Sequence, residues 1–495
     1  MKRLTHIIIC AMALSILLFG CSEEEKFTSS TSARLSFESD TIRFDTVFTT
    51  IGSSTKRFKV FNRNKDGIRI SSILLASGGA SGFRINVDGH SGALLTDIEI
   101  LKEDSLFIFA DIVSHAKNND SPILVRDSLI FRLENGIQQQ IIMEALGQDV
   151  VILKAKTITT DTQLSPARPY LIYDSLIVAP NVTLAIPEGT TLCFHQKAYL
   201  GVHGKIVCNG SLQHPITFRG DRTDKIFPYL PYDRMDAQWG GITLYSTSGD
   251  NYFNYVDIHG GNWGIDCPVS EYIGNKFTIE NSIIHNVKGY GLREMYVAGN
   301  VTNSQITNAG KDCVQLIGGY LDFVHCTIAQ LYPWNGEHGT ALNFTNYQDS
   351  IIYPLEHAYF YNCIITGSSK DEIVGSQIEN ADAAFNAKFL NSLINIKLTG
   401  EESEAIQQMF ASSVNEVAPF NEKNSTAKDD DVIWGKKNFK EANTDIYYYD
   451  FRLDSLSQAR GIGSGEYVPY SPTDRLGKQR PTSKPDAGCY QFNEE

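Results

Sequence analysis

The middle of the chain repeats one short phrase: Asn281-Ser282-Ile283-Ile284, Asn303-Ser304-Gln305-Ile306, His325-Cys326-Thr327-Ile328, Asn362-Cys363-Ile364-Ile365 and Asn391-Ser392-Leu393-Ile394. A degenerate first copy, Tyr255-Val256-Asp257-Ile258, precedes them. The final isoleucines of the six copies lie 26, 22, 22, 37 and 29 residues apart. A second set of apolar residues follows 7, 8, 8, 14 and 8 residues later, at Ile265, Leu292, Val314, Leu342 and Ile373. A near-constant period and internal offset predict a β-helical solenoid with loops inserted between some coils.

Stacked coils place equivalent residues above one another at the strand spacing of about 4.8 Å. We therefore expect a ladder of turn asparagines whose amides hydrogen-bond from coil to coil, at Asn281, Asn303, Asn362 and Asn391. The residue after each turn is small and should point inward, at Val256, Ser282, Ser304, Cys326, Cys363 and Ser392. A leucine-rich repeat is excluded because its Leu-x-x-Leu-x-Leu consensus is absent.

Segments outside the repeats resemble right-handed parallel β-helix proteins of the pectate-lyase-like type. Residues 176–218, followed by Trp239-Gly240-Gly241-Ile242, are similar to the opening coils of that family. Pro485-Asp486-Ala487-Gly488-Cys489-Tyr490 resembles its closing phrase, with Cys489 where alanine is usual. The resemblance implies one β-helix over residues 151–492, with a C-terminal segment that seals the last coil. Residues 401–412 carry helical signals.

Residues 33–150 show short alternating apolar segments separated by Gly, Asn and Asp. The two-residue period is carried by Ile42, Phe44, Phe58, Val60, Ile68, Ile70, Ile85, Val87, Leu106, Ile108, Leu129 and Phe131. Seven or eight strands in a segment of this length predict an antiparallel β-sandwich. Residues 44–73 resemble bacterial immunoglobulin-like (Ig-like) modules of the Hydin and major-sperm-protein type, which implies a spacer or docking role. The expected fold class is therefore all-β, with an N-terminal Ig-like β-sandwich followed by a right-handed parallel β-helix.

The N-terminus has the features of an export signal. Lys2 and Arg3 precede an apolar stretch, residues 7–19, which is too short for a membrane span. Leu18-Phe19-Gly20-Cys21 resembles the lipobox of bacterial lipoproteins. The resemblance implies that residues 1–20 are a signal peptide and that Cys21 is lipidated, which would hold the protein on a membrane. The alternative is a plain secretory signal followed by a chance cysteine.

Residues 21–32 are rich in Ser, Thr and Glu and are predicted to form a flexible tether. The acidic run Ser22-Glu23-Glu24-Glu25 resembles the signal with which some Gram-negative bacteria move lipoproteins to the outer face of the outer membrane. We therefore expect a lipid-anchored outer-membrane protein that is exposed at the cell surface. The alternative is a lipoprotein that faces the periplasm.

Charge and cysteine usage exclude some partners. The chain has 43 Lys and Arg against 57 Asp and Glu, a formal net charge of −14, which argues against binding to nucleic acid. Seven cysteines remain besides Cys10 and Cys21, and no CxxC or Cys/His spacing predicts a zinc site. Cys267, Cys313, Cys326 and Cys363 fall at or beside apolar core positions, which favours buried free thiols over disulfides. We expect no cofactor and no metal.

Asp257, His259 and His285 are the candidate catalytic residues. If Ile258 and Ile284 point inward, their neighbours face outward, so these three side chains should meet across two coils. A carboxylate beside two imidazoles can serve acid–base chemistry. An ordinary polar column is the alternative, because Thr307 and Thr366 occupy the same row. The calcium-binding carboxylates of β-helix lyases and the paired aspartates of β-helix polygalacturonases are not recognisable in the sequence.

Aromatic residues in loops and turns are the candidate glycan-binding residues, since sugars stack their apolar faces on such rings. They are Tyr229, Tyr232, Trp263, Tyr290 and Trp334. The alternative is that these rings pack loops against the coils. We expect a β-helix that binds a glycan or another extracellular polymer without cleaving it. The alternatives are a polysaccharide lyase or glycoside hydrolase acting on the coil face, and a structural or adhesive protein with a surface-protein partner.

Overall fold

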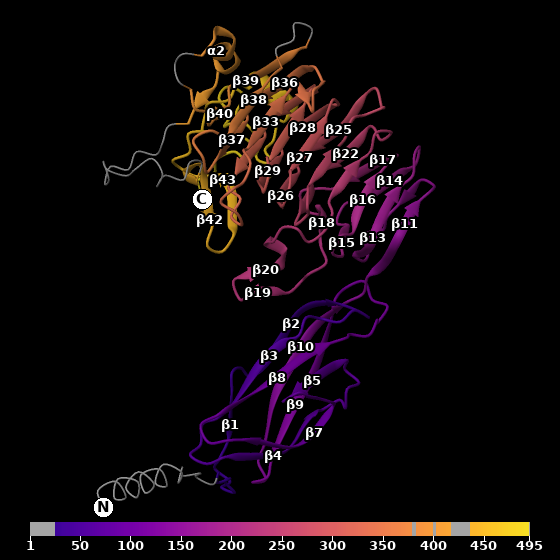
Figure 1. Ribbon diagram of the computed structural model, residues 1–495, viewed down its shortest axis with the longest axis vertical. Helices are drawn as coiled ribbons and strands as arrows, with labels where there is room; N and C mark the ends of the chain where they lie inside the picture. The colour runs from indigo at the N-terminus through magenta and orange to yellow at the C-terminus, as the bar shows by residue number, and fades with distance from the viewer. Residues whose placement is uncertain (1–24, 379–382, 399–401, 417–435, 495) are drawn as a thin grey trace, which may run out of the picture. The chain divides into compact units, whose positions relative to one another are not determined.

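The computed structural model describes residues 25–378, 383–398, 402–416 and 436–494, which fall into two compact units divided between Asp149 and Val150 (Figure 1). Both units are built from β-strands, and the second contains large parallel sheets, which confirms the predicted all-β fold class with a parallel β-helix. Cys21 and the residues before it lie outside the described residues. No helix among the described residues has the length and apolar character needed to cross a membrane.

Two five-stranded sheets form the first unit. One consists of β1 (Leu35–Phe37), β3 (Lys56–Asn62), β8 (Ser105–Ile112), β5 (Phe83–Val87) and β6 (His90–Ser91). The other consists of β2 (Thr41–Phe48), β10 (Gln138–Gln148), β9 (Ile123–Leu133), β4 (Ile68–Leu75) and β7 (Leu94–Ile100). Alternate apolar side chains from both sheets share one core, as the two-residue period predicted, with Val60, Ile108, Ile70 and Phe131 fully buried.

The sandwich differs from the sequence prediction in two ways. It has ten strands rather than seven or eight, because β6 has only two residues and β1 only three, too short to show a period. It is also not wholly antiparallel, since β2 and β10 run in the same direction, with Thr41 opposite Ile142 and Phe48 opposite Gln148. Periodicity along a strand carries no information about the direction of its neighbour.

The second unit is a parallel β-helix with three strands in each regular coil. One face is a nine-stranded sheet: β12 (Thr162–Gln163), β14 (Thr183–Pro187), β17 (Lys205–Asn209), β22 (Asn251–Asn254), β25 (Asn275–Glu280), β28 (Ala298–Thr302), β31 (Gly319–Val324), β36 (Leu355–Tyr361) and β39 (Phe385–Leu390). The other two faces join into one 18-stranded sheet, because the long strand β13 pairs with both β15 and β16.

The strands of the 18-stranded sheet are β11 (Val151–Ile158), β13 (Tyr170–Val178), β15 (Thr191–Phe194), β16 (Tyr199–Val202), β18 (Ile216–Gly220), β21 (Ile242–Leu244), β23 (Val256–His259), β24 (Ile265–Cys267), β26 (Ile283–Val287), β27 (Leu292–Met295), β29 (Gln305–Ala309), β30 (Val314–Ile317), β32 (Thr327–Gln330), β33 (Leu342–Thr345), β37 (Ile364–Gly367), β38 (Ile373–Ser376), β40 (Leu393–Ile394) and β41 (Val414–Asn415). Two short hairpins extend from the coils: β19 (Lys225–Phe227) with β20 (Leu230–Pro231), and β34 (Tyr347–Gln348) with β35 (Ile351–Ile352).

The coil register predicted from the repeats is confirmed. Ile258, Ile284, Ile306, Ile328, Ile365 and Ile394 follow one another in adjacent strands. The second set does the same, in the order Ile265, Leu292, Val314, Leu342 and Ile373. All of these side chains are buried in one continuous core, so the constant offset reports two inward-facing columns of the solenoid.

The turn asparagines have a backbone reason as well as a side-chain one. Asn281, Asn303, Asn362 and Asn391 all have φ between 50° and 53°, the left-handed region that asparagine tolerates better than most residues. Asn303 Nδ2 donates to Asn281 Oδ1 at 2.7 Å, which confirms a coil-to-coil amide bond. His325 occupies the same turn at φ 53° and contacts Asn362 through its Nε2, so it continues the ladder where asparagine is missing.

The column of small residues after these turns is buried, as predicted. Its members also accept hydrogen bonds from the preceding coil: the Val256 N–H donates to Ser282 Oγ at 3.0 Å, and the Ser282 N–H donates to Ser304 Oγ at 3.0 Å. Small hydroxyl and thiol side chains therefore pair backbone groups that the turn removes from the sheet.

Residues 436–494 of the C-terminal segment pack against the side of the coils, and the expectation that this segment seals the last coil stays a prediction. The segment folds back over the outer face of the 18-stranded sheet, where Gly488 N–H donates to the Asn362 carbonyl at 2.8 Å and Cys489 N–H donates to Thr327 Oγ1 at 3.1 Å. Ile364 and Leu393 point outward on this face and are buried with Cys489 in a hydrophobic cluster separate from the core of the coils. These apolar side chains favour packing of the C-terminal segment against the face.

The described end of the coil stack is covered by α2 (Glu404–Phe410), which lies inside the segment predicted to be helical. Phe410 of α2 stacks on Phe389 of β39, with ring centroids 4.7 Å apart. The C-terminal segment also contains the hairpin β42 (Phe439–Asn443) and β43 (Tyr448–Leu453), and η4 (Gly465–Tyr470). Figure 1 shows the hairpin beside the coils.

The cysteines behave as predicted. Cys193, Cys208, Cys267, Cys313, Cys326, Cys363 and Cys489 are all buried and unpaired by disulfides. Burial raises the pKa of the Cys193 and Cys489 thiols to about 12, which keeps them protonated and unreactive at neutral pH.

Candidate functional site

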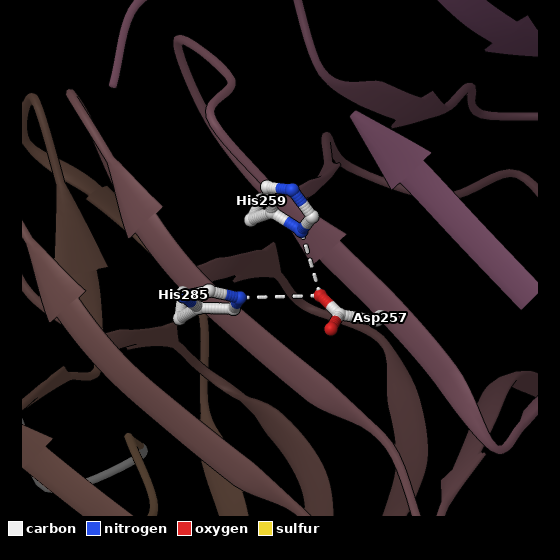
Figure 2. A group of neighbouring side chains, drawn as sticks. All are labelled: Asp257, His259 and His285. Atoms are coloured by element: carbon white, nitrogen blue, oxygen red, sulfur yellow. Dashed lines mark hydrogen bonds and ion pairs between the residues drawn. The ribbon is translucent and has the colours of Figure 1, made fainter. Parts of the chain in front are cut away.

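Asp257, His259 and His285 meet on the outer face of the 18-stranded sheet (Figure 2). Asp257 and His259 are two residues apart on β23, so both point outward while Ile258 between them points into the core. His285 lies directly opposite His259 on the next coil, in β26. His259 Nδ1 is 2.8 Å and His285 Nε2 is 3.2 Å from the same oxygen, Asp257 Oδ1.

A second carboxylate lies behind His259. Asp233 belongs to the short 3-10 helix η1 (Tyr232–Arg234), in the insertion between β18 and β21. Its Oδ1 is 2.9 Å from His259 Nε2 and 2.9 Å from Arg219 Nη2. Arg219, Asp233, His259, Asp257 and His285 thus form one chain of alternating charge and hydrogen bonds across the face.

The charges in this chain shift the pKa values of its members. Burial of His259 disfavours its cation, but the adjacent Asp257 and Asp233 carboxylates outweigh this and raise its pKa to about 9. Burial also opposes ionisation of Asp257, but the two imidazoles hold the pKa of its carboxyl well below the usual range. Asp233 behaves in the same way, with its pKa lowered to about 2 despite partial burial.

These bonds leave the two histidines with different capabilities. Both ring nitrogens of His259 are engaged by carboxylates and its side chain is only 7% exposed, so at neutral pH it is a fixed imidazolium. The side chain of His285 is 24% exposed, and its Nδ1 has no hydrogen-bond partner within the described part of the chain. A bound ligand can therefore reach the free ring nitrogen of His285, but neither ring nitrogen of His259.

A cavity of about 370 Å³ opens beside this cluster. The coil face supplies one wall, the hairpin β42–β43 the opposite one, and η1 closes one side; the lining residues are Arg234, Asp257, Ile283, His285, Asn286, Gln305, Asn308, Tyr447, Tyr448, Tyr449, Asp450, Phe451 and Tyr490. The volume is in the range of sites for small ligands. The C-terminal segment makes this cavity because it lies over the coil face.

Two polar atoms in the cavity wall are buried without a hydrogen-bond partner among the described residues: Tyr449 Oη and Asn308 Oδ1. Buried polar groups are nearly always paired, so these two atoms are exceptions within the cavity lining. Both are closed off from solvent, so a ligand in the cavity would reach them only after neighbouring side chains move. By contrast, the hydroxyl of Tyr490 in this wall is paired, since Tyr490 Oη donates to Gln305 Oε1 at 2.9 Å.

The carboxylate of Asp450 stands on the hairpin side of the cavity. Arg452 holds it with its guanidinium, through Nε at 3.0 Å from both oxygens and Nη2 at 2.6 Å from Oδ2, and with its backbone N–H at 3.1 Å from Oδ1. Burial opposes its ionisation, but these bonds outweigh that effect and lower the pKa of Asp450. Both carboxylates of the cavity, Asp257 and Asp450, are therefore fixed anions at neutral pH.

Trp334 and Tyr232 lie next to the cavity but do not line it. The Trp334 ring is half-buried, 5.2 Å from the Tyr447 ring at the hairpin tip and 5.0 Å from the Tyr332 ring. Tyr232 is covered by the guanidinium of Arg222, whose Cζ is 3.9 Å from its ring centroid. These two rings pack the insertions together and hold the hairpin tip in place.

The other aromatic candidates are spread over the coils. Tyr229 is 53% exposed and stacks with the equally open Phe227, with centroids 5.6 Å apart, at the turn between β19 and β20. Trp263 donates to the Ile242 carbonyl at 3.2 Å. Tyr290 lies under two cations, with Arg293 Cζ 5.4 Å and Lys311 Nζ 5.0 Å from its ring centroid.

Sequence reasoning missed the hairpin side of the cavity. Three consecutive tyrosines, residues 447–449, precede Asp450, and this run was the available signal. The orphaned atom of Asn308 was not predictable, because it depends on a second row of left-handed asparagines, in which Asn308 Nδ2 donates to Asn286 Oδ1 at 3.2 Å.

Comparisons with known proteins add the following. No protein-family model matches the sequence, and no curated protein matches it. Among solved structures, a PapD-like domain of human CEP192 is similar over 26% of this chain and 97% of that domain, at 7% identity and a TM-score of 0.17. The Agl-KA catalytic domain is similar over 70% of this chain and 76% of its own, at 12% identity and a TM-score of 0.25.

The catalytic domain of a GH87 alpha-1,3-glucanase in complex with nigerose is also similar, over 70% of this chain and 79% of its own, at 10% identity and a TM-score of 0.18. Similarity at this level carries no argument about activity.

Proposed function

We propose that this chain is a lipoprotein anchored through Cys21 at the surface of the outer membrane, and that its β-helix binds an extracellular glycan without cleaving it. The anchor rests on the lipobox-like residues 18–21, and the surface location on the acidic run that follows them. The glycan site is the cavity between the coil face and the hairpin β42–β43.

The observation that carries the proposal is that two residues of one cavity lining, Tyr449 and Asn308, each carry a buried polar atom without a hydrogen-bond partner among the described residues. Sugar hydroxyls both donate and accept hydrogen bonds, so they can pair with a phenol and with an amide oxygen. The tyrosine rings at residues 447–449 add flat apolar surfaces on which the apolar faces of a sugar can stack. Arg234 and Asp257 supply charged groups that orient a polar ligand.

Binding without cleavage is favoured by the state of the two carboxylates. Glycoside hydrolysis requires one carboxylic acid that stays protonated at working pH, which means a raised pKa. In this cavity the pKa values of Asp257 and Asp450 are both lowered, the first by two imidazoles and the second by Arg452, in each case against the effect of burial. Neither group is a proton donor at neutral pH.

A panel of purified polysaccharides tests the proposal, with retention of the mature protein and release of reducing or unsaturated ends scored together. Retention without release supports it. The decisive variant is Tyr449→Phe, which removes an unpaired hydroxyl and keeps the ring. It should bind several-fold more weakly and melt at the same or a higher temperature, because the free protein loses an unsatisfied buried group.

Two variants serve as controls. Tyr490→Phe removes a hydroxyl that is paired with Gln305, so it should lower the melting temperature. Tyr470→Phe lies at a site 71% exposed in η4 and should change neither quantity. Full retention by Tyr449→Phe would show that the glycan binds elsewhere, and no retention of any polysaccharide by the parent protein would favour the protein-binding alternative.

A second candidate function is favoured by His285, whose Nδ1 is free beside the ionised Asp257 in the cavity wall. This pair can remove a proton from a bound sugar, as a polysaccharide lyase requires. Release of unsaturated ends that disappears in His285→Ala, with retention unchanged, would establish that function in place of binding alone.

A further inference from the structure

Asp257, His259 and His285 offer three ligand atoms that converge on one point of the coil face. The carboxylate oxygen, His259 Nδ1 and His285 Nε2 all lie within 4.8 Å of one another, and they are the one such group of three among the described residues. We infer that these three side chains form a binding site for a divalent transition-metal ion of the Zn²⁺ class, with its open coordination positions facing the cavity. This inference does not depend on glycan binding.

The distances are close to those that a metal needs. Two ligands at about 2.1 Å from one ion stand roughly 3.0 Å apart in octahedral and about 3.4 Å apart in tetrahedral geometry. Asp257 Oδ1 is 2.8 Å from His259 Nδ1 and 3.2 Å from His285 Nε2. The ion would replace the two protons that the imidazoles now direct at this oxygen. All three residues lie on the adjacent strands β23 and β26, so small side-chain rotations are enough to bring their ligand atoms to these distances.

The hydrogen bond and ion pair behind His259 also fit a metal site. Histidines that bind metals usually donate their other ring N–H to a carboxylate, which fixes the tautomer and the ring orientation. His259 directs Nε2 at Asp233 Oδ1 at 2.9 Å, which leaves Nδ1 as the metal-facing nitrogen. Arg219 in turn holds Asp233 at 2.9 Å.

The donor set selects the class of ion. Two imidazoles and one carboxylate suit Zn²⁺ and other first-row transition ions, whereas Ca²⁺ and Mg²⁺ prefer oxygen ligands alone. Three protein ligands leave at least one position open, as in catalytic rather than structural zinc sites. Asp257 and His285 both line the 370 Å³ cavity, so the open position is accessible from it.

The spacing along the chain explains why the sequence predicted no metal site. Asp257 and His285 are 28 residues apart on different coils, so they match no contiguous metal motif. Only the stacking of β26 on β23 brings His285 opposite His259.

Zinc binding to the mature chain, without a polyhistidine tag and without any glycan, tests the inference. After chelator treatment, reloading with Zn²⁺ and dialysis against metal-free buffer, we expect elemental analysis to find one Zn²⁺ per chain, and calorimetry on the chelator-treated chain measures the affinity. His285→Ala should weaken binding at least tenfold, and Asp233→Asn should weaken it by about 10–100-fold through His259. Co²⁺ in the same site should show a visible absorption band that His285→Ala abolishes.

A matched control is His357→Ala. His357 also pairs with an aspartate, Asp322, at 2.7 Å, but on the nine-stranded sheet and without a second histidine. Zinc affinity should not change in this variant. Zinc that is not retained by the parent chain, or is retained equally by His285→Ala, would overturn the inference. Because the assay contains no glycan, its failure leaves the glycan proposal standing, and a failed glycan screen leaves the zinc result standing.

Discussion

Replacing Asn303 by leucine perturbs the centre of the asparagine ladder. Asn303 is 1% exposed and has φ of 52°. Its Nδ2 donates to Asn281 Oδ1 at 2.7 Å, and its Oδ1 accepts from Arg480 Nη2 at 2.6 Å. Arg480 is itself buried, and its Nε and Nη1 have no partner in the described structure. The substitution therefore removes the hydrogen bond of the Arg480 guanidinium together with a rung of the ladder.

The expected loss is the sum of three effects. An unpaired acceptor on Asn281 and an unpaired donor on Arg480 cost about 1–3 kcal/mol each. Leucine in the left-handed region adds about 1–2 kcal/mol. Allowing for partial relaxation, we expect a loss of about 3–5 kcal/mol in the free energy of unfolding of the β-helix unit.

Chemical denaturation, followed by a probe in the β-helix unit, measures this loss. The matched control is Asn300→Leu in the same coil, where the side chain is exposed and makes one amide contact with Asn275 at 3.2 Å. That variant should change stability by less than about 0.5 kcal/mol. Equal stability of the two variants would refute the reasoning, since the ladder would then contribute no more than a surface amide.

Three further predictions concern the site and the anchor. The pKa of His259 in the folded protein is about 9, above its usual value of 6.5. Its contribution to stability should therefore be complete below pH 6.5 and lost as the pH rises through 9. Melting curves recorded in the presence of a chelator should show this fall, and His259→Gln should flatten it. Trp334→Ala should weaken glycan retention by about 1 kcal/mol, or roughly fivefold, because the hairpin tip loses its aromatic contact. Circular dichroism should show an intact fold, and unchanged retention would count against this prediction. Cys21→Ala should move the protein out of the membrane fraction, whereas alanines at residues 23–25 should reduce only its accessibility to external protease; cell fractionation and protease shaving distinguish the two.

The stacked part of the fold was predictable from the sequence because each coil repeats the environment of the one before it. The isoleucine columns and the turn asparagines recur at a near-constant period, so one correct alignment fixes the register of the whole stack. The same alignment placed Asp257 and His259 on the outer face and His285 beside them. Their role as a functional site stays a prediction.

The cavity was not predictable, because it depends on contacts between distant parts of the chain. Cys489 bonds Thr327 from 162 residues away, and Tyr490 bonds Gln305 from 185 residues away. Nothing periodic relates these segments. Ile364 and Leu393 point outward and are apolar, which indicates that another segment covers this face. Both residues also fit the repeated coil phrase, so the sequence alone does not distinguish them from residues of the core.

Hydrogen exchange of the mature chain, with and without a retained polysaccharide, tests the central claim most directly. The account predicts slower exchange in β43 (Tyr448–Leu453) and in β26 (Ile283–Val287), the two walls of the cavity, with no change in the nine-stranded sheet. Protection confined to the nine-stranded sheet or to residues 33–149 would contradict it, because the glycan would then bind elsewhere.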